Sequence, residues 1–448
     1  MTLPHFRITA PLAALIALAL LASGCEGSPF PGNGGVRGED APLAQDKPSP
    51  DEAKGTGHSA DRDGETSGSP DDTAPAAPKP AVPPPAEATL VAVGDVMMHT
   101  PQLPGAYDEA KGAYDFSGFF VPVKSVIESA DWAVANLETP IGGDERGFKG
   151  YPLFNAPVAL ADALKGAGFD VLSVANNHAL DQGFRGLAHT LETLRSRELV
   201  PIGAYDSEEA ARSVALLEKN GIVQAFLSYT YGTNGIPVPT DKPYAVNIIE
   251  DGRIRDDIAK ARKAGADVVS VSLHFGNEYQ REPSEEQKRL ARLCVDAGAD
   301  VVIGHHPHVV QPYEWREVER EDGAKRRGLI MYSLGNFISN QSGDYKDYGA
   351  MLRVTFRKTH AADGAASTEI AEVDAIPTWV HKYVSDGKKR YRVISLDALE
   401  AGADPLLTDR LLATLHDAAA DMNEHLESMA VATNPPPSDA PVTPVSSR

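Results

Sequence analysis

Five apolar runs in this chain each end in carboxylate, amide or imidazole side chains, although the runs lie far apart in the sequence. The polar segments are residues 94–95, 136–138, 176–178, 273–274 and 304–308. In α/β folds, polar residues that follow strands gather at the carboxyl edge of a sheet. Carboxylate, amide and imidazole groups together are ligands of divalent metals. The pattern therefore predicts an α/β fold with a metal centre at the strand ends.

Strand and helix patterns alternate through the middle of the chain. The predicted strands are residues 89–93, 132–135, 170–174, 222–228, 268–273, 301–303 and 329–333, and the predicted helices are residues 159–167, 184–197, 254–264 and 284 to about 298. Gly168 follows the first helix as expected for a C-cap. Residues 349–393 alternate polar and apolar positions, as antiparallel strands do. We therefore expect two mixed sheets and not one parallel sheet.

The N-terminal segment has the features of an export signal. Arg7 precedes an apolar run at residues 8–22 that is too short for a stable membrane span. Residues 22–25, Ala-Ser-Gly-Cys, resemble a bacterial lipoprotein signal box. The sequence thus predicts cleavage after residue 24, lipidation of Cys25 and a lipid-anchored protein of the bacterial cell envelope. An ordinary signal peptide or an uncleaved anchor, with Cys25 incidental, is the alternative.

Composition divides the chain into five predicted parts. They are a signal peptide at 1–24, a disordered tether rich in Pro, Gly and acidic residues at 25–87, a folded domain at 88–385, a helical extension at 386–432 and a disordered tail at 433–448. The net charge of −21 argues against a nucleic-acid partner. Cys294 has no partner once Cys25 is lipidated, so we expect it to be a buried free cysteine.

The segment Gly-His-His-Pro-His at 304–308 is the strongest single signal, because three imidazoles lie within four residues. Pro307 favours an extended backbone at His306, which would point His306 and His308 to the same side. Surface histidines in a turn are the alternative.

The other polar segments are less specific when each is taken alone. Asn176, Asn177 and His178 are costly to bury without partners, although an Asx turn with a satisfied histidine would also explain them. Asp95 could equally be a turn or cap residue, and a single histidine such as His274 at a strand end is more often structural. Residues 229–235 fit a lid over the site and a plain surface loop equally well.

The ordered set of motifs resembles a known family. The motifs are residues 94–97 (Gly-Asp-Val-Met), 136–140 (Asn-Leu-Glu-Thr-Pro), 175–181 (Ala-Asn-Asn-His-Ala-Leu-Asp), 274–279 (His-Phe-Gly-Asn-Glu-Tyr), 304–309 (Gly-His-His-Pro-His-Val) and 333–337 (Ser-Leu-Gly-Asn-Phe). Together they resemble the CapA family of poly-γ-glutamate capsule synthesis (PGA_cap), which is related to the calcineurin-like metallophosphatases. The resemblance implies a four-layer α/β/β/α sandwich with a metal centre at the strand ends.

The resemblance also implies roles for individual residues. It implies metal ligands at Asp95, Glu138, Asn177, His274, His306 and His308 and a catalytic His178. Either Asp181 or Glu138 could orient His178, and Asp181 is taken as the second catalytic residue. The candidate substrate contacts are Asn136, Asn176, His305 and Asn336, of which Asn336 could instead position the metal ligands. One or two divalent ions are expected, with Mn, Fe, Zn and Mg all compatible. The parent metallophosphatase pattern has a histidine at the position of Met97 and usually an aspartate at that of Glu138, so one metal position is expected to be weak or missing.

Two functions fit these expectations. The first is a metal-dependent hydrolase of phosphoesters or γ-glutamyl amides that acts in poly-γ-glutamate synthesis, export or anchoring, with His178 as general acid. The second is a non-catalytic accessory lipoprotein that binds an anionic surface polymer such as poly-γ-glutamate, together with other capsule-synthesis proteins. A structural envelope lipoprotein with vestigial motifs is a third reading. The chain has no His-Glu-x-x-His, Walker or Gly-x-Ser-x-Gly motif.

Overall fold

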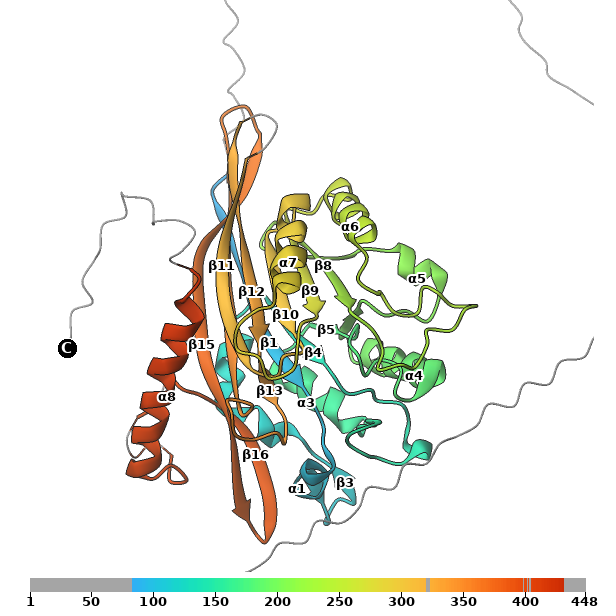
Figure 1. Cartoon of the computed structure of the whole chain (residues 1–448), viewed down its shortest axis with the longest axis vertical. Helices are drawn as coiled ribbons and strands as arrows, with labels where there is room; N and C mark the ends of the chain where they lie inside the picture. The colour runs from blue at the N-terminus through green and yellow to red at the C-terminus, as the bar shows by residue number, and fades with distance from the viewer. Residues whose placement is uncertain (1–82, 320–322, 398, 401, 403, 431–448) are drawn as a thin grey trace, which may run out of the picture. The chain divides into compact units, whose positions relative to one another are not determined.

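Two β-sheets face each other between helices (Figure 1). One sheet contains β1 (Ala86–Val96), β4 (Trp132–Leu137), β5 (Val171–Ser173), β6 (Val200–Ile202), β13 (Asn336–Ile338), β14 (Tyr348–His360), β15 (Ala366–Ser385) and β16 (Lys388–Ser395). The other contains β7 (Ala215–Lys219), β8 (Ile222–Thr230), β9 (Val268–His274), β10 (Val301–His305), β11 (Val310–Glu319) and β12 (Lys325–Leu334). A small ribbon is formed by β2 (Tyr107–Asp108) and β3 (Ala113–Tyr114).

This computed structural model describes residues 83–319, 323–397, 399–400, 402 and 404–430. The predicted signal peptide, Cys25, the tail at 433–448 and all but residues 83–87 of the predicted tether lie outside the described residues. The helices are α1 (Leu103–Ala106), α2 (Lys124–Glu128), α3 (Ala159–Ala167), α4 (Gly183–Arg195), α5 (Glu208–Arg212), α6 (Asp251–Lys263), α7 (Glu285–Ala297) and α8 (Asp409–Glu427). Within the described part, no helix is long and apolar enough to cross a membrane.

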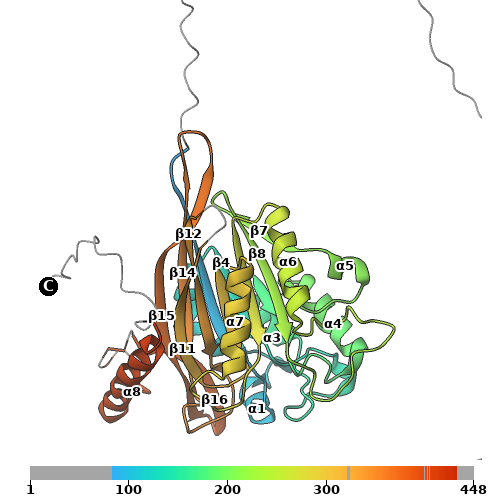
Figure 2. The same ribbon diagram turned by 45° about the horizontal axis from the view of Figure 1, so that its top comes forward.

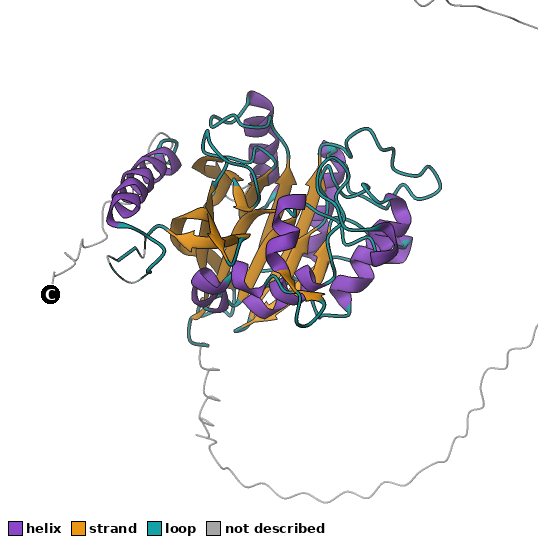
Figure 3. Cartoon of the chain, turned by 90° about the horizontal axis from the view of Figure 1, so that it is seen from below, coloured by secondary structure: helices purple, strands orange, loops and turns teal. Residues whose placement is uncertain are grey.

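Three buried apolar clusters separate four layers. In β1, Val91 and Val93 pack with the helices α3 and α4, whereas Leu90 and Ala92 face the second sheet. In the second sheet, Val271 packs against α6 and α7 on its outer side. This period-two alternation lets each strand contribute to two clusters at once. Viewed from below, the strands lie in the middle with helices on the outer sides (Figure 3), which is the expected four-layer α/β/β/α sandwich.

Several local predictions are confirmed. Gly168 ends α3 in the left-handed conformation, with a φ of 104°. Ser284 and Gln287 form a capping box at the start of α7. Cys294 is a free, buried cysteine on α7, and burial raises the pKa of its thiol to about 12. This cysteine therefore packs as a small apolar residue.

The region after residue 385 differs from the predicted helical extension. It begins with β16, which pairs antiparallel with β15 at the edge of the sheet, and only α8 is helical. Asp386 and Gly387 form the turn between the two strands with φ values of 53° and 71°. An Asp-Gly pair with two positive φ values is typical of a tight hairpin, and this signal was missed in the sequence. In Figures 1 and 2, α8 lies beside β11 and β15.

Candidate metal centre

The carboxyl ends of four strands meet at one place between the two sheets. Asp95 of β1 lies beside Asn136 of β4 in parallel register. His274 of β9 lies beside His305 of β10, also in parallel register. Parallel neighbours end at the same edge of a sheet, so each sheet presents a pair of polar side chains at the same end. The convergence expected from the sequence is therefore present.

Asp95 joins the two pairs. Its Oδ1 accepts a 2.8 Å hydrogen bond from Asn136 Nδ2, and its Oδ2 lies 3.0 Å from His308 Nδ1. His305 Nδ1 is 3.5 Å from Asp95 Oδ1. Burial alone would raise the pKa of Asp95, but the contacts with His305 and His308 outweigh burial and hold it well below its usual value. Asp95 is therefore a carboxylate although it is fully buried.

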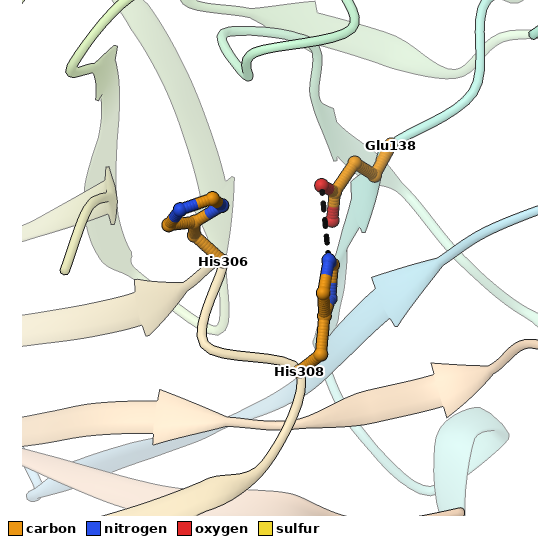
Figure 4. A group of neighbouring side chains, drawn as sticks. All are labelled: Glu138, His306 and His308. Atoms are coloured by element: carbon orange, nitrogen blue, oxygen red, sulfur yellow. Dashed lines mark ion pairs between the residues drawn. The ribbon is translucent and has the colours of Figure 1, made fainter. Parts of the chain in front are cut away.

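Glu138 belongs to two potential metal-binding groups. One consists of Glu138, His306 and His308 (Figure 4), and the other of Asp95, Glu138 and His274; in each, the ligand atoms lie within 4.8 Å of one another. Glu138 Oε1 is 3.5 Å from His274 Nε2 and 3.8 Å from His308 Nε2, yet it accepts no hydrogen bond. Burial and the charge of Asp95 raise the pKa of Glu138 well above its usual value.

The unsatisfied atoms fit a bound cation. A buried carboxylate oxygen without a partner is costly, and a divalent ion would provide that partner. Nδ1 of the buried His306 also lacks a hydrogen bond. Burial and the neighbouring His308 lower the pKa of His306 to about 4, and burial lowers the pKa of His274 as well. Both imidazoles are therefore neutral near pH 7, which is the form that binds metals.

The backbone of the histidine loop differs from the prediction. His306 and His308 have φ values of 96° and 57°, so the segment is not extended as Pro307 suggested. The His306 N–H donates to Asp95 Oδ2 at 3.4 Å, and Asn336 Nδ2 donates to the His308 carbonyl at 3.2 Å. These contacts hold a strained loop, a feature often found at functional sites. Both rings nevertheless face Glu138 (Figure 4).

His178 and Asp181 form a buried pair beside the candidate metal ligands. His178 Nδ1 lies 2.8 Å from Asp181 Oδ2, which also accepts the Phe154 N–H at 2.8 Å. The Phe154 ring and the imidazole are nearly perpendicular, with ring centroids 4.7 Å apart. His178 Nε2 is 3.5 Å from Asn234 Nδ2. Asp181, and not Glu138, is thus the carboxylate that orients His178.

The predicted amide residues have two kinds of contact. Asn177 Oδ1 is 3.1 Å from His274 Nε2, which places this amide against a candidate ligand. Asn176 Nδ2 instead donates to the Leu137 carbonyl at 2.8 Å, and Asn336 Nδ2 donates to the Lys346 carbonyl at 2.7 Å. The four residues expected to contact substrate are at most 1% exposed: Asn136, Asn176, His305 and Asn336. The three amides donate to Asp95 or to backbone carbonyls beside the ligands, whereas neither ring nitrogen of His305 has a hydrogen-bond partner among the described residues. Contact with a substrate stays a prediction for all four.

Sequence reasoning missed three tyrosines around the site. The ring of Tyr231 is 4.8 Å from that of His306, Tyr279 is 6.1 Å from His308 and Tyr151 is 6.5 Å from His178. Tyr231 lies in the segment 229–235, whose composition was the available signal. Tyr279 is the last residue of the motif at 274–279, whereas no sequence signal marks Tyr151.

Met97, which replaces an expected metal-binding histidine, is part of the buried core. Met97 is 2% exposed and packs as an apolar residue. Neither candidate metal-binding group within the described residues includes His99, the next histidine along the chain. His99 Nδ1 instead accepts the Asn340 N–H at 3.3 Å, and burial together with His308 lowers the pKa of His99 to about 4. The group that contains Asp95 therefore has only one histidine.

Residues 89–341 match the family model for the bacterial capsule synthesis protein PGA_cap, which is more than half of the chain. The chain belongs to this family. It is 30% identical over 285 residues to the capsule biosynthesis protein CapA of Bacillus anthracis, covering 61% of this chain and 65% of that protein. It is 30% identical over 320 residues to the PGA biosynthesis protein CapA of Bacillus subtilis, covering 68% and 77%. The match thus spans just under two thirds of the Bacillus anthracis relative.

More distant similarities extend this set. A probable polyglutamine synthesis accessory protein of Mycobacterium tuberculosis is 29% identical over 254 residues, covering 52% of this chain and 63% of that protein. Among solved structures, the NAD nucleotidase of Haemophilus influenzae is similar, with a TM-score of 0.39 and 13% sequence identity. The match covers 75% of this chain and 68% of the nucleotidase chain.

Proposed function

We propose that this PGA_cap protein is a metal-dependent hydrolase of the bacterial cell envelope that acts in poly-γ-glutamate capsule synthesis, export or anchoring. The observation that best supports a metal site is the position of Glu138. This residue belongs to both buried groups of potential ligands, and its Oε1 has no hydrogen-bond partner. The names of the Bacillus relatives support the link to a capsule and to poly-γ-glutamate.

The residues divide into those that would hold the metal and those that would move a proton. Asp95, Glu138, His274, His306 and His308 would hold it, with Asn177 beside them. A bound divalent ion lowers the pKa of water and polarises an acyl or phosphoryl oxygen.

His178 would exchange a proton with the substrate. Its Nδ1 faces Asp181, which leaves Nε2 as the atom that takes up or releases the proton. A protein that only holds a polymer has no need of this oriented pair, so the pair favours hydrolysis over the accessory-protein reading.

The test is the metal content of the full chain, purified without chelator and measured by elemental analysis. We expect one or two equivalents of a transition metal, and their loss in the His306→Ala/His308→Ala double variant. No metal in the wild type, even after reconstitution with Mn or Zn, would overturn the proposal.

A second measurement separates catalysis from polymer binding. The metal-loaded protein is assayed on γ-glutamyl amide and phosphodiester substrates, beside His178→Ala, which should keep its metal and lose hydrolysis. Metal without hydrolysis of either substrate would favour the non-catalytic polymer-binding lipoprotein.

The envelope location rests on residues 1–25 and has its own test. Cys25→Ser should move the protein from the membrane fraction to the soluble fraction of the exported material, because the thiol that would be lipidated is gone. An unchanged distribution would show that Cys25 is not the anchor.

A further inference from the structure

Exposed aromatic residues surround the buried candidate centre. Tyr151, Tyr231 and Tyr279 are 74%, 47% and 46% exposed. Each ring lies against a different histidine of the site, and each comes from a different loop, after β4, β8 and β9. Large exposed aromatic side chains around a buried polar site are typical of ligand contacts.

The backbone fixes two of these tyrosines to the ligand-bearing segments. The Tyr279 N–H donates to the Pro307 carbonyl at 2.7 Å, and Tyr279 has a φ of 65°. A bulky residue with positive φ is strained and persists only where its surroundings impose the conformation. The Tyr231 N–H donates to the His274 carbonyl at 3.0 Å. The positions of both rings are therefore set by the same chain segments that carry the histidines.

Glu278 places a negative charge among the tyrosines. This residue is exposed and, within the described residues, forms no ion pair with lysine, arginine or histidine. Glu278 directly precedes Tyr279 in the loop after β9, and after burial it contributes to raising the pKa of Tyr279. The three rings therefore lie around the histidines of the site, and the carboxylate belongs to the same loop as Tyr279.

This combination selects a cation. The face of a neutral tyrosine ring attracts an ammonium group, and a carboxylate beside it adds a charge of the required sign. The ring of Tyr279 already attracts one such group, since Lys346 Nζ lies 5.1 Å from its centroid. An anionic group would meet Glu278 and the net charge of −21 unfavourably.

We propose that Tyr151, Tyr231, Tyr279 and Glu278 form a subsite for the positively charged amino group of the substrate, next to the metal centre. The assignment of this amine to a substrate rests on the proposed function, whereas binding of the amine does not. The ligand class is a primary amine of the amino-acid or peptide type, with its uncharged part extending toward the histidines.

The test compares n-butylammonium with 1-butanol, which has the same carbon chain and no charge, by ligand-observed NMR titration of the full chain. We expect at least fivefold tighter binding of the ammonium ion. Glu278→Gln should remove most of this preference, and Tyr279→Leu should weaken binding of the ammonium ion at least threefold.

Matched controls come from elsewhere in the chain. Glu218→Gln removes an exposed carboxylate of β7, and Tyr107→Leu removes an exposed tyrosine that packs on Tyr114. Neither should change the preference for the ammonium ion. Equal affinities for the two probes, or no effect of Glu278→Gln, would overturn the subsite.

Metal content measured on the same preparations keeps the two proposals separate. Amine binding without metal would support the subsite and overturn the metal-dependent hydrolase. Metal without amine binding would support the metal centre and overturn the subsite.

Discussion

At the scale of single residues, Glu138 is a candidate metal ligand that also destabilises the metal-free protein. It is fully buried, lies near the negative charge of Asp95 and has an oxygen that accepts no hydrogen bond. Such a carboxyl group destabilises the metal-free protein unless it is protonated. Glutamine has nearly the same shape without the charge, so it separates metal binding from folding stability.

We therefore predict that Glu138→Gln loses at least 90% of the bound metal while the metal-free protein unfolds at the same temperature as the wild type or slightly above it. Elemental analysis and thermal unfolding in chelator are the measurements. The matched control is Glu314→Gln, because Glu314 is a buried glutamate paired with Arg292 and Tyr332 and belongs to neither candidate metal-binding group of the described residues. It should lose about 1–3 kcal/mol of stability and keep its metal. Full metal in Glu138→Gln would contradict the assignment.

At the scale of elements, a glycine next to a ligand lets two backbones approach closely. A Cβ on Gly94, directly before Asp95, would meet the Gly335 carbonyl oxygen at 1.9 Å. A side chain there would force β1 and its neighbour apart and displace the carboxylate.

We predict that Gly94→Ala lowers the free energy of unfolding by about 2–4 kcal/mol, as for other overpacked buried positions, and weakens metal binding. Urea denaturation and metal titration would measure both effects. Gly166→Ala on α3 is the control, since its Cβ would meet nothing within 4 Å. That change should stabilise the protein by about 0.5–1 kcal/mol. If both variants behaved alike, close approach at Gly94 would not be the reason for its glycine.

A second element-scale feature is an imidazole held in its neutral form by β15 and β16. His381 Nδ1 accepts a 3.1 Å hydrogen bond from Arg392 Nε, and its ring stacks on Trp379. Burial and the charge of Arg392 lower the pKa of His381 to about 4. A histidine whose folded-state pKa is depressed adds stability above its unfolded pKa of about 6.5 and loses it as the pH falls toward 4.

The wild type should therefore lose about 1 kcal/mol more stability between pH 7 and pH 5 than His381→Gln. The glutamine side chain keeps an acceptor for Arg392 but does not titrate. Urea unfolding midpoints at the two pH values provide the comparison. Equal losses of stability in both proteins would show that His381 is not responsible for the loss at acid pH.

At the scale of the whole folded unit, the candidate centre lies where the two sheets meet. Asp95 and Asn136 belong to one sheet, and His274 and His305 to the other. An ion held by ligands from both sheets would link them. Its binding should therefore stabilise the whole folded unit against unfolding, and not only the loops. This follows because a ligand that binds only the native state raises stability by mass action.

Metal at about 100 times its dissociation constant should add about 2.7 kcal/mol and raise the unfolding temperature by several degrees, and chelator should reverse the shift. Differential scanning calorimetry would record it, with the His306→Ala/His308→Ala variant as the control that shows no shift. An equal shift in that variant would place the metal elsewhere.

The sequence by itself determined the two mixed sheets and most of the candidate ligands, because apolar periodicity and strand-end polarity are local properties of the chain. It identified β1, β4, β9 and β10 and the polar residues that follow them. It also identified the ends of α3 and α7, since caps depend on adjacent residues.

Only the tertiary structure decided which of these side chains meet. The sharing of Glu138 between two groups, the choice of Asp181 as the partner of His178 and the positive φ at His306 all depend on strand order and register. The arrangement of Tyr151, Tyr231 and Tyr279 around the histidines depends on three loops that are far apart in the sequence. Local patterns carry no information about such distances, because long-range contacts are set by the packing of the two sheets as a whole.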